Sequence, residues 1–583
     1  MPARRVVIVG GGPEGAAVIA MPPDPGLAAV VVVPARDEQE RIGACLRALA
    51  EQRGVEPGAF EVVLVLDHCT DATRSRALHA ASVHPAMPLI VLQSVLPGAG
   101  HARRVGMDFA CQRLLAAGRP KGLIASTDAD SRVAPDWLAT QLELAGEGAR
   151  AIGGRIELDP GEAAALPAAV LEARALQARE RLTRVRARAS HGACGHHQFS
   201  GASLALTADT YREIGGLPSG EALEDEALER ALEDRGIEIL RTARVQVTTS
   251  ARTEGRASRG LARDLGLADW RARRSFRAAD FTAEGLLEDK AGPISVILPT
   301  REVATTIGPI LDSICPLRDL GLVDEILVVD SASQDGTALV AAAHGAAVLQ
   351  EDELLTAHGP ARGKGDAMWR ALSISRGEIV VFLDADTRDF SPGFIVGLLG
   401  PLLHDPEIHF VKGAFLRPLQ LEDTVLPGEG GRVTELVARP LLNLYAPHLA
   451  GFDQPLACEL AARADLLRRL SFPVGYGVEI ANLIDAASVA GIDALAQVDL
   501  GTRQNRHQPL RDLTAMSYAV MVAAAARIHV AGLPPAPAPG PLALPPRSGE
   551  TVNELRQVPV IERPPLDSLP GLAAAGARLA LGP

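Results

Sequence analysis

The stretch Ile379–Asp386 reads Ile-Val-Val-Phe-Leu-Asp-Ala-Asp, an apolar run that stops at two carboxylates separated by one residue. Such a run is typical of a strand buried on both faces of a parallel sheet. Open α/β sheets bind their ligands at the carboxyl ends of these strands. Asp384 and Asp386 lie on the same side of the chain, and carboxylates of this kind suit Mg²⁺ or Mn²⁺ carrying a diphosphate. The stretch predicts an α/β domain with a metal–diphosphate site at one sheet edge.

The same pattern occurs earlier, where Leu123–Asp130 reads Leu-Ile-Ala-Ser-Thr-Asp-Ala-Asp. An isolated Asp-x-Asp also fits an ordinary turn after a strand. Here, however, strands and helices alternate in the same order before both copies, with a period of roughly 260 residues. The expected strands are Ala29–Val33, Glu61–Leu66 and Leu89–Gln93 in the first copy, and Ile294–Leu298, Glu325–Val329 and Ala347–Leu349 in the second. The repeat predicts two tandem, doubly wound α/β domains.

The limits of the domains follow from composition and from the repeat. We expect a leader at 1–27, a first domain at 28–262, an Arg-rich linker at 263–292, a second domain at 293–532 and a Pro-rich tail at 533–583. Proline-rich segments of this kind are extended or disordered. Gly10–Gly15 formally matches the dinucleotide-binding pattern, but Pro22-Pro23 follows after few residues, so a short leader is the better interpretation.

Bulk composition narrows the class of protein. The net charge of −13 argues against a nucleic-acid-binding body, because phosphate-backbone binding needs a basic surface. The six cysteines show no paired spacing, which indicates a reducing, cytoplasmic compartment. The apolar stretch Met516–Leu533 is interrupted by Arg527 and His529, so we expect a packing helix and no membrane span. Its part Met516–Ala526 could pack a homodimer.

Four short motifs in each half form a recognisable series: a Pro-x-x-acidic loop, an Asp-x-Ser/Cys-x-Asp-x-Thr-like loop, Gly-Lys-Gly or Ala-Arg, and Asp-x-Asp. This series resembles the nucleotide-sugar glycosyltransferases of the GT-A fold. The resemblance implies that the first two loops hold base and ribose, and that a cation on the following helix neutralises the diphosphate. The implied donor-binding residues are Pro299, Thr300, Arg301, Glu302, Asp330, Ser331, Lys364, Asp384, Ala385 and Tyr476 in the second half, and Pro34, Ala35, Asp37, Glu38, Asp67, Arg103 (with Arg104 as the alternative) and Asp128 in the first.

The second half, from about Pro293 to Ile528, resembles a narrower family, the glucosyl-3-phosphoglycerate synthases, which are retaining family 81 enzymes. The motifs that carry this resemblance are Gly363–Arg370, Gly430–Pro440, Gln454–Leu456 and Gly475–Ile480. The resemblance implies an acceptor site for 3-phosphoglycerate, a carboxylate that holds the donor sugar, and a divalent metal. The residues concerned are Gly431, Arg432, Thr434 and His507 for the acceptor, Glu479 for the sugar, and Asp386 with His507 for Mg²⁺ or Mn²⁺.

Two positions depart from that family pattern. Glu302 takes the place of the family's Asn or Asp, and Val303 follows it where the family has Glu. The family's metal-binding His aligns with Asn505, and His507 stands two residues further on. Either His507 is the ligand after a small loop shift, which we favour, or the metal site is weakened.

The first half resembles the broad family 2 of inverting glycosyltransferases. Phe199–Ser203 with Gly215–Leu217 looks like its acceptor loop, and Glu224-Asp225 matches the place of its acidic base. Inversion requires a carboxylate that takes the acceptor proton, and we assign Asp225, with Glu224 as the rival; both also fit a solvated helix start. Asp130 is the expected metal ligand. A zinc site made by His191, Cys194, His196 and His197 is a weaker alternative than a mobile loop over the substrate.

The resemblance implies metal-dependent transfer of a sugar from a nucleotide diphosphate sugar, UDP-glucose by preference, to 3-phosphoglycerate by the second half. A second glycosyl transfer is expected from the first half. Two alternatives stay open: a polyprenyl-phosphate or other small-acceptor sugar transferase, and a chain in which one half binds nucleotide sugars without turnover.

Overall fold

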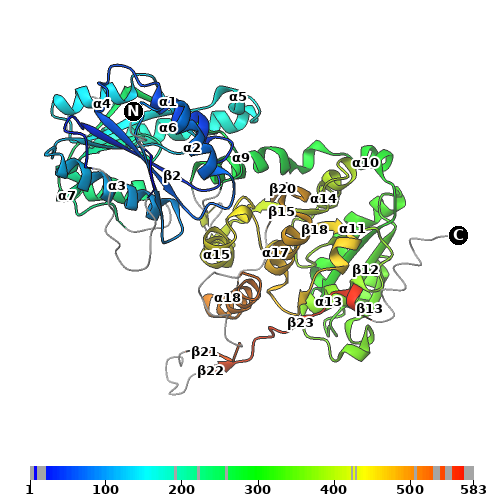
Figure 1. Ribbon diagram of the computed structural model, residues 1–583. Helices are drawn as coiled ribbons and strands as arrows, with labels where there is room; N and C mark the ends of the chain where they lie inside the picture. Colours follow the sequence, from blue (N-terminus) through cyan, green and yellow to red (C-terminus); the bar gives the residue numbers. More distant parts are fainter. Residues whose placement is uncertain are drawn as a thin grey trace. The chain divides into compact units, whose positions relative to one another are not determined.

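The chain forms two compact units, here called unit 1 (Met1–Asp269) and unit 2 (Trp270–Pro583) (Figure 1). The computed structural model describes residues 6–8, 22–188, 194–218, 224–255, 260–421, 424–426, 430–503, 508–528, 539–544 and 554–569.

Unit 1 contains a nine-stranded sheet in the order β1-β4-β3-β2-β5-β8-β7-β9-β6. Its strands are β1 (Val6–Ile8), β2 (Ala29–Ala35), β3 (Phe60–Leu66), β4 (Leu89–Gln93), β5 (Leu123–Ser126), β6 (Ser131–Val133), β7 (Ala151–Leu158), β8 (Leu204–Thr207) and β9 (Ile239–Thr249). Its helices are α1 (Ile42–Ala50), α2 (Thr73–Val83), α3 (Ala99–Ala116), α4 (Trp137–Gly146), α5 (Pro160–Ala163), α6 (Ala168–Arg188), α7 (Ala208–Glu213) and α8 (Glu224–Glu233), and α9 (Leu261–Arg274) continues across the limit of the unit.

Unit 2 contains an eight-stranded sheet in the order β10-β20-β15-β18-β14-β11-β12-β13. These strands are β10 (Ser275–Arg277), β11 (Ile294–Thr300), β12 (Glu325–Asp330), β13 (Ala347–Gln350), β14 (Ile379–Phe382), β15 (Phe410–Leu416), β18 (Leu460–Arg463) and β20 (Leu495–Thr502). Short pairs are formed by β16 (Leu419–Leu421) with β17 (Thr424–Leu426), β19 (Phe472–Pro473) with β23 (Glu562–Arg563), and β21 (Leu542–Leu544) with β22 (Glu554–Arg556). The helices are α10 (Ala283–Asp289), α11 (Ala304–Asp319), α12 (Thr337–Ala343), α13 (Lys364–Leu372), α14 (Gly393–His404), α15 (Arg439–Tyr445), α16 (Ala464–Arg468), α17 (Val478–Ala490) and α18 (Leu510–Ala525).

The two sheets share one strand plan. In unit 1 the run β4-β3-β2-β5-β8-β7-β9 corresponds position by position to β13-β12-β11-β14-β18-β15-β20 in unit 2. In both, the strand after the central parallel group runs antiparallel to its neighbours, namely β8 in unit 1 and β18 in unit 2. The predicted repeat is therefore confirmed, while the sheets are mixed, because β8 and β18 return against the parallel direction.

Continuous apolar strands are buried on both faces in each unit. Along β2, Val31 and Val33 join one core cluster, whereas Val30 and Val32 join the cluster on the opposite face. Along β14, Val380 and Phe382 face one cluster and the intervening residues face the other. This two-sided burial explains why the strands read as unbroken Val, Ile and Leu runs, as in helix-covered parallel sheets.

The segments expected to be the leader, the linker and the tail each contain a strand that pairs within one of the units. Within the expected leader, β1 pairs in parallel with β4, while Gly10–Gly15 lies outside the described residues. The expected linker supplies β10, which extends the unit 2 sheet beside β20. In the tail expected to be extended or disordered, β23 pairs with β19, and Leu566 and Leu569 enter the core of unit 2. The composition of these segments did not predict the pairings, because each pairing joins segments that are far apart in sequence.

Candidate active sites

Lys364 is positioned in unit 2 by two glycines with different roles. Gly363 precedes α13 with φ +123°, a backbone conformation that favours glycine, and Gly365 has no room for a side chain because a Cβ atom would lie 1.9 Å from the carbonyl oxygen of Pro473. The Nζ of Lys364 donates to Asp384 at 2.5 Å and lies 3.0 Å from an oxygen of Glu479, near the start of α17. Burial opposes the charge of Lys364, but Asp384 and Glu479 outweigh it and raise its pKa well above the usual value. Lys364 is a permanent cation at the sheet edge.

A second cation at this edge is Arg503, which directly follows β20. Its Nη2 donates to Asp384 at 2.6 Å and its Nη1 to the buried Glu459, also at 2.6 Å. Burial works against ionisation of Asp384, yet Lys364 and Arg503 together hold its pKa far below the usual range. The first carboxylate of the Asp-x-Asp pair is thus fixed between two cations.

Asp386, the second carboxylate, points more openly to solvent. Its side chain is 52% exposed, and Arg503 lies 3.6 Å away. Partial burial and the neighbouring Asp384 raise the pKa of Asp386. A half-exposed carboxylate just after a strand fits an oxygen-preferring cation such as Mg²⁺ or Mn²⁺, and the role of Asp386 as a metal ligand stays a prediction. His507 and Asn505 lie outside the described residues, so their part in a metal site stays a prediction.

The first two loops of unit 2 meet as predicted, because Thr300 and Asp330 are paired residues at the ends of β11 and β12. Asp330 is buried and accepts hydrogen bonds from the backbone N–H of Ser333 at 3.0 Å and its hydroxyl at 2.6 Å. Glu302, in the left-handed region with φ 54°, accepts from the N–H of Gln334 at 2.8 Å. Val303 packs against the apolar core. Asp330 and Glu302, which are expected to contact the donor, thus form hydrogen bonds that stabilise the two loops. The remaining expected donor residues lie at or within three residues after the strand ends, and their contact with a donor stays a prediction: Pro299, Arg301, Ser331 and Ala385.

The expected acceptor residues lie at the start of an irregular helix. Gly431 has φ +71°, and Arg432 opens helical backbone that becomes a π-helix at Thr434–Ala438 and continues as α15. Arg432 donates to the carbonyl of Gln508 at 2.7 Å, and Thr434 is buried. Single π-turns are frequent at functional sites. Tyr476 is 47% exposed, three residues before Glu479.

Arg417 connects the acceptor turn to the Asp-x-Asp pair and was not foreseen. The N–H of Gly430 donates to its carbonyl at 2.8 Å, and a Cβ added at Gly431 would lie 3.5 Å from its Cδ. Its guanidinium and that of Arg503 lie 5.9 and 5.2 Å from the centre of the Phe415 ring. Burial and Arg503 lower the pKa of Arg417, whereas Asp384 and Asp386 act in the opposite direction. Arg417 adds positive charge beside the expected phosphoglycerate turn.

Unit 1 builds a comparable centre around Arg103 on α3. Its guanidinium donates to Glu224 at 2.8 Å, to Asp128 at 2.7 Å and to the Ser126 hydroxyl at 2.5 Å. It also donates to the carbonyl of Gly201, where a Cβ atom would lie 2.3 Å from Nη2. Arg103 therefore fills in unit 1 the bridging place that Lys364 fills in unit 2, between the first Asp of the pair and a helix-start glutamate. The alternative Arg104 instead lies 3.6 Å from Asp108 along α3.

Arg252, three residues after β9, is the second cation of unit 1. It donates to both carboxylate oxygens of Glu38, at 3.0 and 2.7 Å, and lies 2.9 Å from an oxygen of Asp130. Burial and Asp128 raise the pKa of Asp130 to about 6, although Arg252 acts to lower it. Glu38, expected to contact the donor base, is buried and held by this arginine.

Asp225, the expected base, lies at the beginning of α8. Its carboxylate accepts from the N–H of Gly201 at 3.3 Å. Burial and the adjacent Glu224 raise the pKa of Asp225, which suits a group that must accept a proton. Glu224 is engaged by Arg103, so the geometry favours Asp225 over its rival. The identity of the base stays a prediction.

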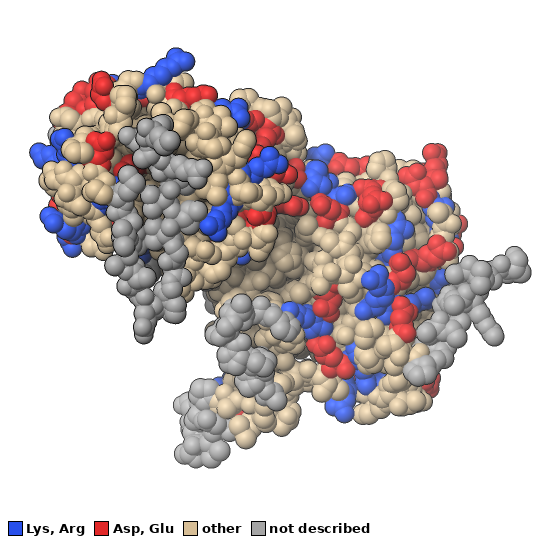
Figure 2. Space-filling view, viewed as in Figure 1, with Lys and Arg blue, Asp and Glu red and all other residues tan. Residues whose placement is uncertain are grey.

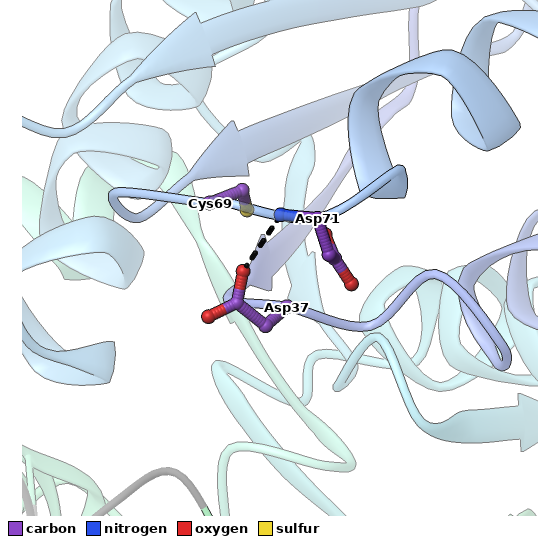
Figure 3. Close-up of side chains that lie close together, drawn as sticks. All are labelled: Asp37, Cys69 and Asp71. Carbon is purple, nitrogen blue, oxygen red and sulfur yellow. Dashed lines mark hydrogen bonds between the residues drawn. The ribbon is translucent and has the colours of Figure 1, made fainter.

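Asp37, Cys69 and Asp71 lie close together in unit 1 (Figure 3). Asp37 accepts from the N–H of Thr70 at 2.7 Å and of Asp71 at 3.3 Å, so it ties the first loop to the second. Glu302 makes the matching contact in unit 2, which indicates a loop-fastening role for Asp37. At the neighbouring strand ends lie the other expected donor residues, Pro34, Ala35 and Asp67, the last of them buried with Arg36 at 3.9 Å.

The zinc alternative gains no support from the described residues. The Sγ of Cys194 donates to the carbonyl of His196 at 2.7 Å, and Nδ1 of His196 accepts from the N–H of Gln198. Burial and neighbouring arginines lower the pKa of His197 to about 4. His191 lies outside the described residues. Within the described ranges, the group close enough to share an ion is Asp37 with Cys69 and Asp71.

Two family models match the chain. The model described as glycosyltransferase like family 2 covers residues 25–264, and the model described as glycosyl transferase family 2 covers residues 295–413. Glucosyl-3-phosphoglycerate synthase of Mycolicibacterium paratuberculosis is 44% identical over 289 residues, which span 49% of this chain and 88% of that protein. The chain belongs to the glucosyl-3-phosphoglycerate synthase family. It is a glycosyltransferase, and the predicted pair of GT-A domains is confirmed.

Further relatives carry the same name. Glucosyl-3-phosphoglycerate synthase of Mycobacterium tuberculosis is 47% identical over 245 residues, spanning 41% of this chain and 75% of that protein. The crystal structure of the Mycobacterium tuberculosis enzyme in complex with Mn²⁺, UDP and phosphoglyceric acid matches with 41% identity, over 49% of this chain and 95% of that one, at a TM-score of 0.43. The crystal structure of mannosyl-3-phosphoglycerate synthase from Rubrobacter xylanophilus matches with 45% identity, over 52% of this chain and 99% of that one, at a TM-score of 0.46.

The surface agrees with a small-molecule enzyme of this family. On the face shown in Figure 2, acidic and basic side chains are interspersed over both units. The net charge of the full sequence is −13. Of the helices that the structure describes, none combines the length and the apolar character needed to cross a membrane.

Sequence reasoning missed the partners of the Asp-x-Asp pairs. These are Arg252 in unit 1, and Arg503, Glu459 and Arg417 in unit 2. One signal was available in the sequence, because an arginine follows the last long strand of each copy. Arg252 stands three residues after the end of β9, and Arg503 directly follows β20. Only the fold shows that these arginines reach the carboxylates.

Proposed function

We propose that unit 2 transfers glucose from UDP-glucose to 3-phosphoglycerate. The observation that carries the proposal is the Asp384–Lys364–Glu479 arrangement beside the Gly431-Arg432 turn, in a chain 41–47% identical to several glucosyl-3-phosphoglycerate synthases. The motifs of that family stand in unit 2, including Gly430–Pro440 and Gly475–Ile480. The alignment with the Mycolicibacterium paratuberculosis enzyme covers 289 residues, which is more than the whole of unit 1, Met1–Asp269.

The proposed mechanism depends on positioning and charge. Lys364 neutralises the donor diphosphate, and Glu479 holds the hydroxyl groups of the sugar. Arg432 and Thr434 bind the phosphoglycerate anion at a glycine turn that opens a helix, where N–H groups and the guanidinium converge. A divalent cation bound by Asp386 would supply Lewis-acid stabilisation of the leaving group. In a front-face retaining transfer the leaving phosphate oxygen accepts the acceptor proton, so no protein base is required.

The test of unit 2 is product formation from UDP-glucose and 3-phosphoglycerate with Mg²⁺ or Mn²⁺. The intact chain is expected to form glucosyl-3-phosphoglycerate, and Arg432→Ala is expected to raise the KM for 3-phosphoglycerate at least tenfold. Arg439→Ala is the matched control, because Arg439 lies on the same helix and pairs with Glu435. No product from the intact chain, or an equal effect of both substitutions, would contradict the proposal.

We propose further that unit 1 performs a second glycosyl transfer with inversion. In support, unit 1 repeats the strand plan of unit 2, bridges Asp128 and Glu224 through Arg103, and offers Asp225 as a partly buried carboxylate with raised pKa. Asp225 takes the proton of the acceptor hydroxyl as the nucleotide departs from the opposite face.

The product of unit 2 is the first acceptor to test for unit 1. The intact chain, supplied with glucosyl-3-phosphoglycerate and UDP-glucose or GDP-mannose, is expected to form a disaccharide product that Asp225→Asn no longer forms. Asp209→Asn, a change at another helix-start carboxylate of unit 1, is the control. Donor binding without any transfer would instead favour a nucleotide-sugar-binding role for unit 1.

A further inference from the structure

The two centres treat the second carboxylate of the Asp-x-Asp pair differently. In unit 2 the Asp386 side chain is 52% exposed, and Arg503 lies 3.6 Å from one of its oxygens. In unit 1 the Asp130 side chain is 14% exposed, and Arg252 lies 2.9 Å from its Oδ2. The hydroxyl of Ser131 donates to the other oxygen of Asp130 at 3.3 Å. Arg252 therefore occupies one oxygen of Asp130, and Ser131 shares its hydroxyl between the other oxygen and the Thr249 hydroxyl, which is 2.9 Å away.

Arg252 is firmly held in that position. Glu38 accepts two hydrogen bonds from its guanidinium, and both side chains are mostly buried, at 18% and 7% exposed. In unit 2 the residue at the place of Glu38 is Val303, which packs against the apolar core, and Arg503 pairs with Glu459 and Asp384. The Glu38–Arg252 pair is thus what places a guanidinium directly on Asp130 in unit 1.

The sequence around Arg252 offers little else to a metal ion. The chain has no histidine between His197 and His344, whereas His507 follows the last strand of unit 2. A guanidinium stays protonated at any working pH and cannot ligate a metal, but its planar fork binds phosphate oxygens well. The residues of unit 1 therefore do not fit the divalent cation expected at Asp130.

We propose that unit 1 binds its nucleotide diphosphate sugar without a divalent cation, and that Arg252 carries the positive charge that faces the diphosphate. The inference rests on the proposed function of unit 1 as a nucleotide-sugar transferase. It divides the chain into one metal-dependent and one metal-independent centre.

The first test counts Mn²⁺ ions bound to the full chain by electron paramagnetic resonance, with UDP or GDP present. One ion per chain is expected, lost in Asp386→Asn and retained in Asp130→Asn. Two ions per chain, one of which disappears in Asp130→Asn, would overturn the inference.

The second test measures UDP and GDP binding to the Asp386→Asn chain in EDTA by calorimetry. One nucleotide site should remain, with a Kd within twofold of that in Mg²⁺, and Arg252→Gln should weaken it at least tenfold. Arg132→Gln removes a more exposed arginine of the same unit, paired with Asp159, and should change nothing. Because Arg252→Gln leaves Glu38 buried without its partner, Arg252→Lys and the double change Glu38→Gln/Arg252→Gln separate misfolding from lost charge. Arg252→Lys should retain metal-free binding, whereas the double variant should fold and lose it.

The outcomes separate this inference from the proposed function. Binding that depends on Arg252 but appears only with Mg²⁺ would overturn metal independence and leave the transferase assignment intact. No Arg252-dependent nucleotide binding under any condition would overturn both.

Discussion

Lys412 on β15 is a fully buried lysine whose ammonium group donates to a backbone carbonyl. Its Nζ donates to the carbonyl of Ala457 at 2.7 Å. Burial lowers the pKa of Lys412 to about 8, although Glu479, Cys458 and Glu459 act to raise it. A buried ammonium group is costly without a close carboxylate, so this lysine destabilises the folded state at neutral pH.

We expect the free energy of unfolding to rise with pH because of Lys412. Between pH 8 and the ordinary value of 10.5 the unfolded chain binds more protons than the folded one, so stability increases across this window. Below pH 8 the lysine is charged in both states and its penalty is full. Lys412→Met should remove the rise and stabilise unit 2 at pH 7 by about 3 kcal/mol. Denaturant unfolding of both chains at pH 7, 8, 9 and 10 measures the free energy of unfolding. An equal rise with pH in Lys412→Met would contradict the prediction.

Arg503 shows the opposite case, a buried cation with close partners. Arg503→Gln leaves Glu459 buried without a counter-charge, and burial already raises the pKa of Glu459. We expect a loss of about 3–5 kcal/mol in unfolding free energy, together with weaker UDP binding. Arg376→Gln removes an arginine that is 78% exposed, and its partner Glu325 still accepts a hydrogen bond from Ser295, so the change should cost about 1 kcal/mol or less. Equal losses of unfolding free energy in the two variants would show that the pairs of Arg503 with Asp384 and Glu459 stabilise unit 2 no more than the Arg376–Glu325 pair does.

At the scale of elements, the tail strand β23 fastens the helix that carries Lys364. Arg563 donates to both oxygens of Asp366, at 2.8 and 2.7 Å, and lies 5.5 Å from the centre of the Trp369 ring. Asp366 is fully buried on α13, two residues after Lys364, and the indole N–H of Trp369 donates to the carbonyl of Pro564 at 2.9 Å. The tail therefore supports the first turn of α13.

Arg563→Ala should remove the hydrogen bonds that hold the first turn of α13 through Asp366. It leaves Asp366 with Arg370 as its remaining cation, and we expect a loss of about 3 kcal/mol in unfolding free energy. Because Lys364 loses its support, the Kd for UDP should increase about tenfold. Arg556→Ala, a change at a less buried arginine of the same tail, is the control in both measurements. Unchanged nucleotide binding in Arg563→Ala would show that the tail stabilises the fold without positioning Lys364.

Elements were predictable from sequence where a short local pattern decides them. The strand at Leu89–Gln93 agrees with β4, and the other expected strands differ from β2, β3, β11, β12 and β13 by one or two residues at an end. The Gly-Lys-Gly and Asp-x-Asp motifs also meet as expected, since Lys364 contacts Asp384. The roles of β10, β23, Arg252 and Arg503 were not predictable, because each depends on a partner about 90 residues or more away in sequence.

At the scale of the whole molecule, the two units have separate cores. Unit 1 buries the Arg113–Glu61 pair, at 2.5 and 2.6 Å, and unit 2 buries the Arg503 network. We expect calorimetry to resolve two unfolding transitions, since chains with several domains depart from two-state behaviour. Arg113→Gln should lower the Tm of one transition and Arg503→Gln that of the other. A single transition that both substitutions lower together would contradict independent units.

The claim that unit 2 transfers the sugar to 3-phosphoglycerate is tested most directly by comparing matched changes in the two Asp-x-Asp pairs. The measurement is the rate of glucosyl-3-phosphoglycerate formation by the intact chain, by Asp128→Asn in unit 1 and by Asp386→Asn in unit 2. We predict that Asp128→Asn retains the rate of the intact chain and that Asp386→Asn loses at least a hundredfold. Loss in Asp128→Asn with activity retained in Asp386→Asn would place the reaction in unit 1 and contradict the account.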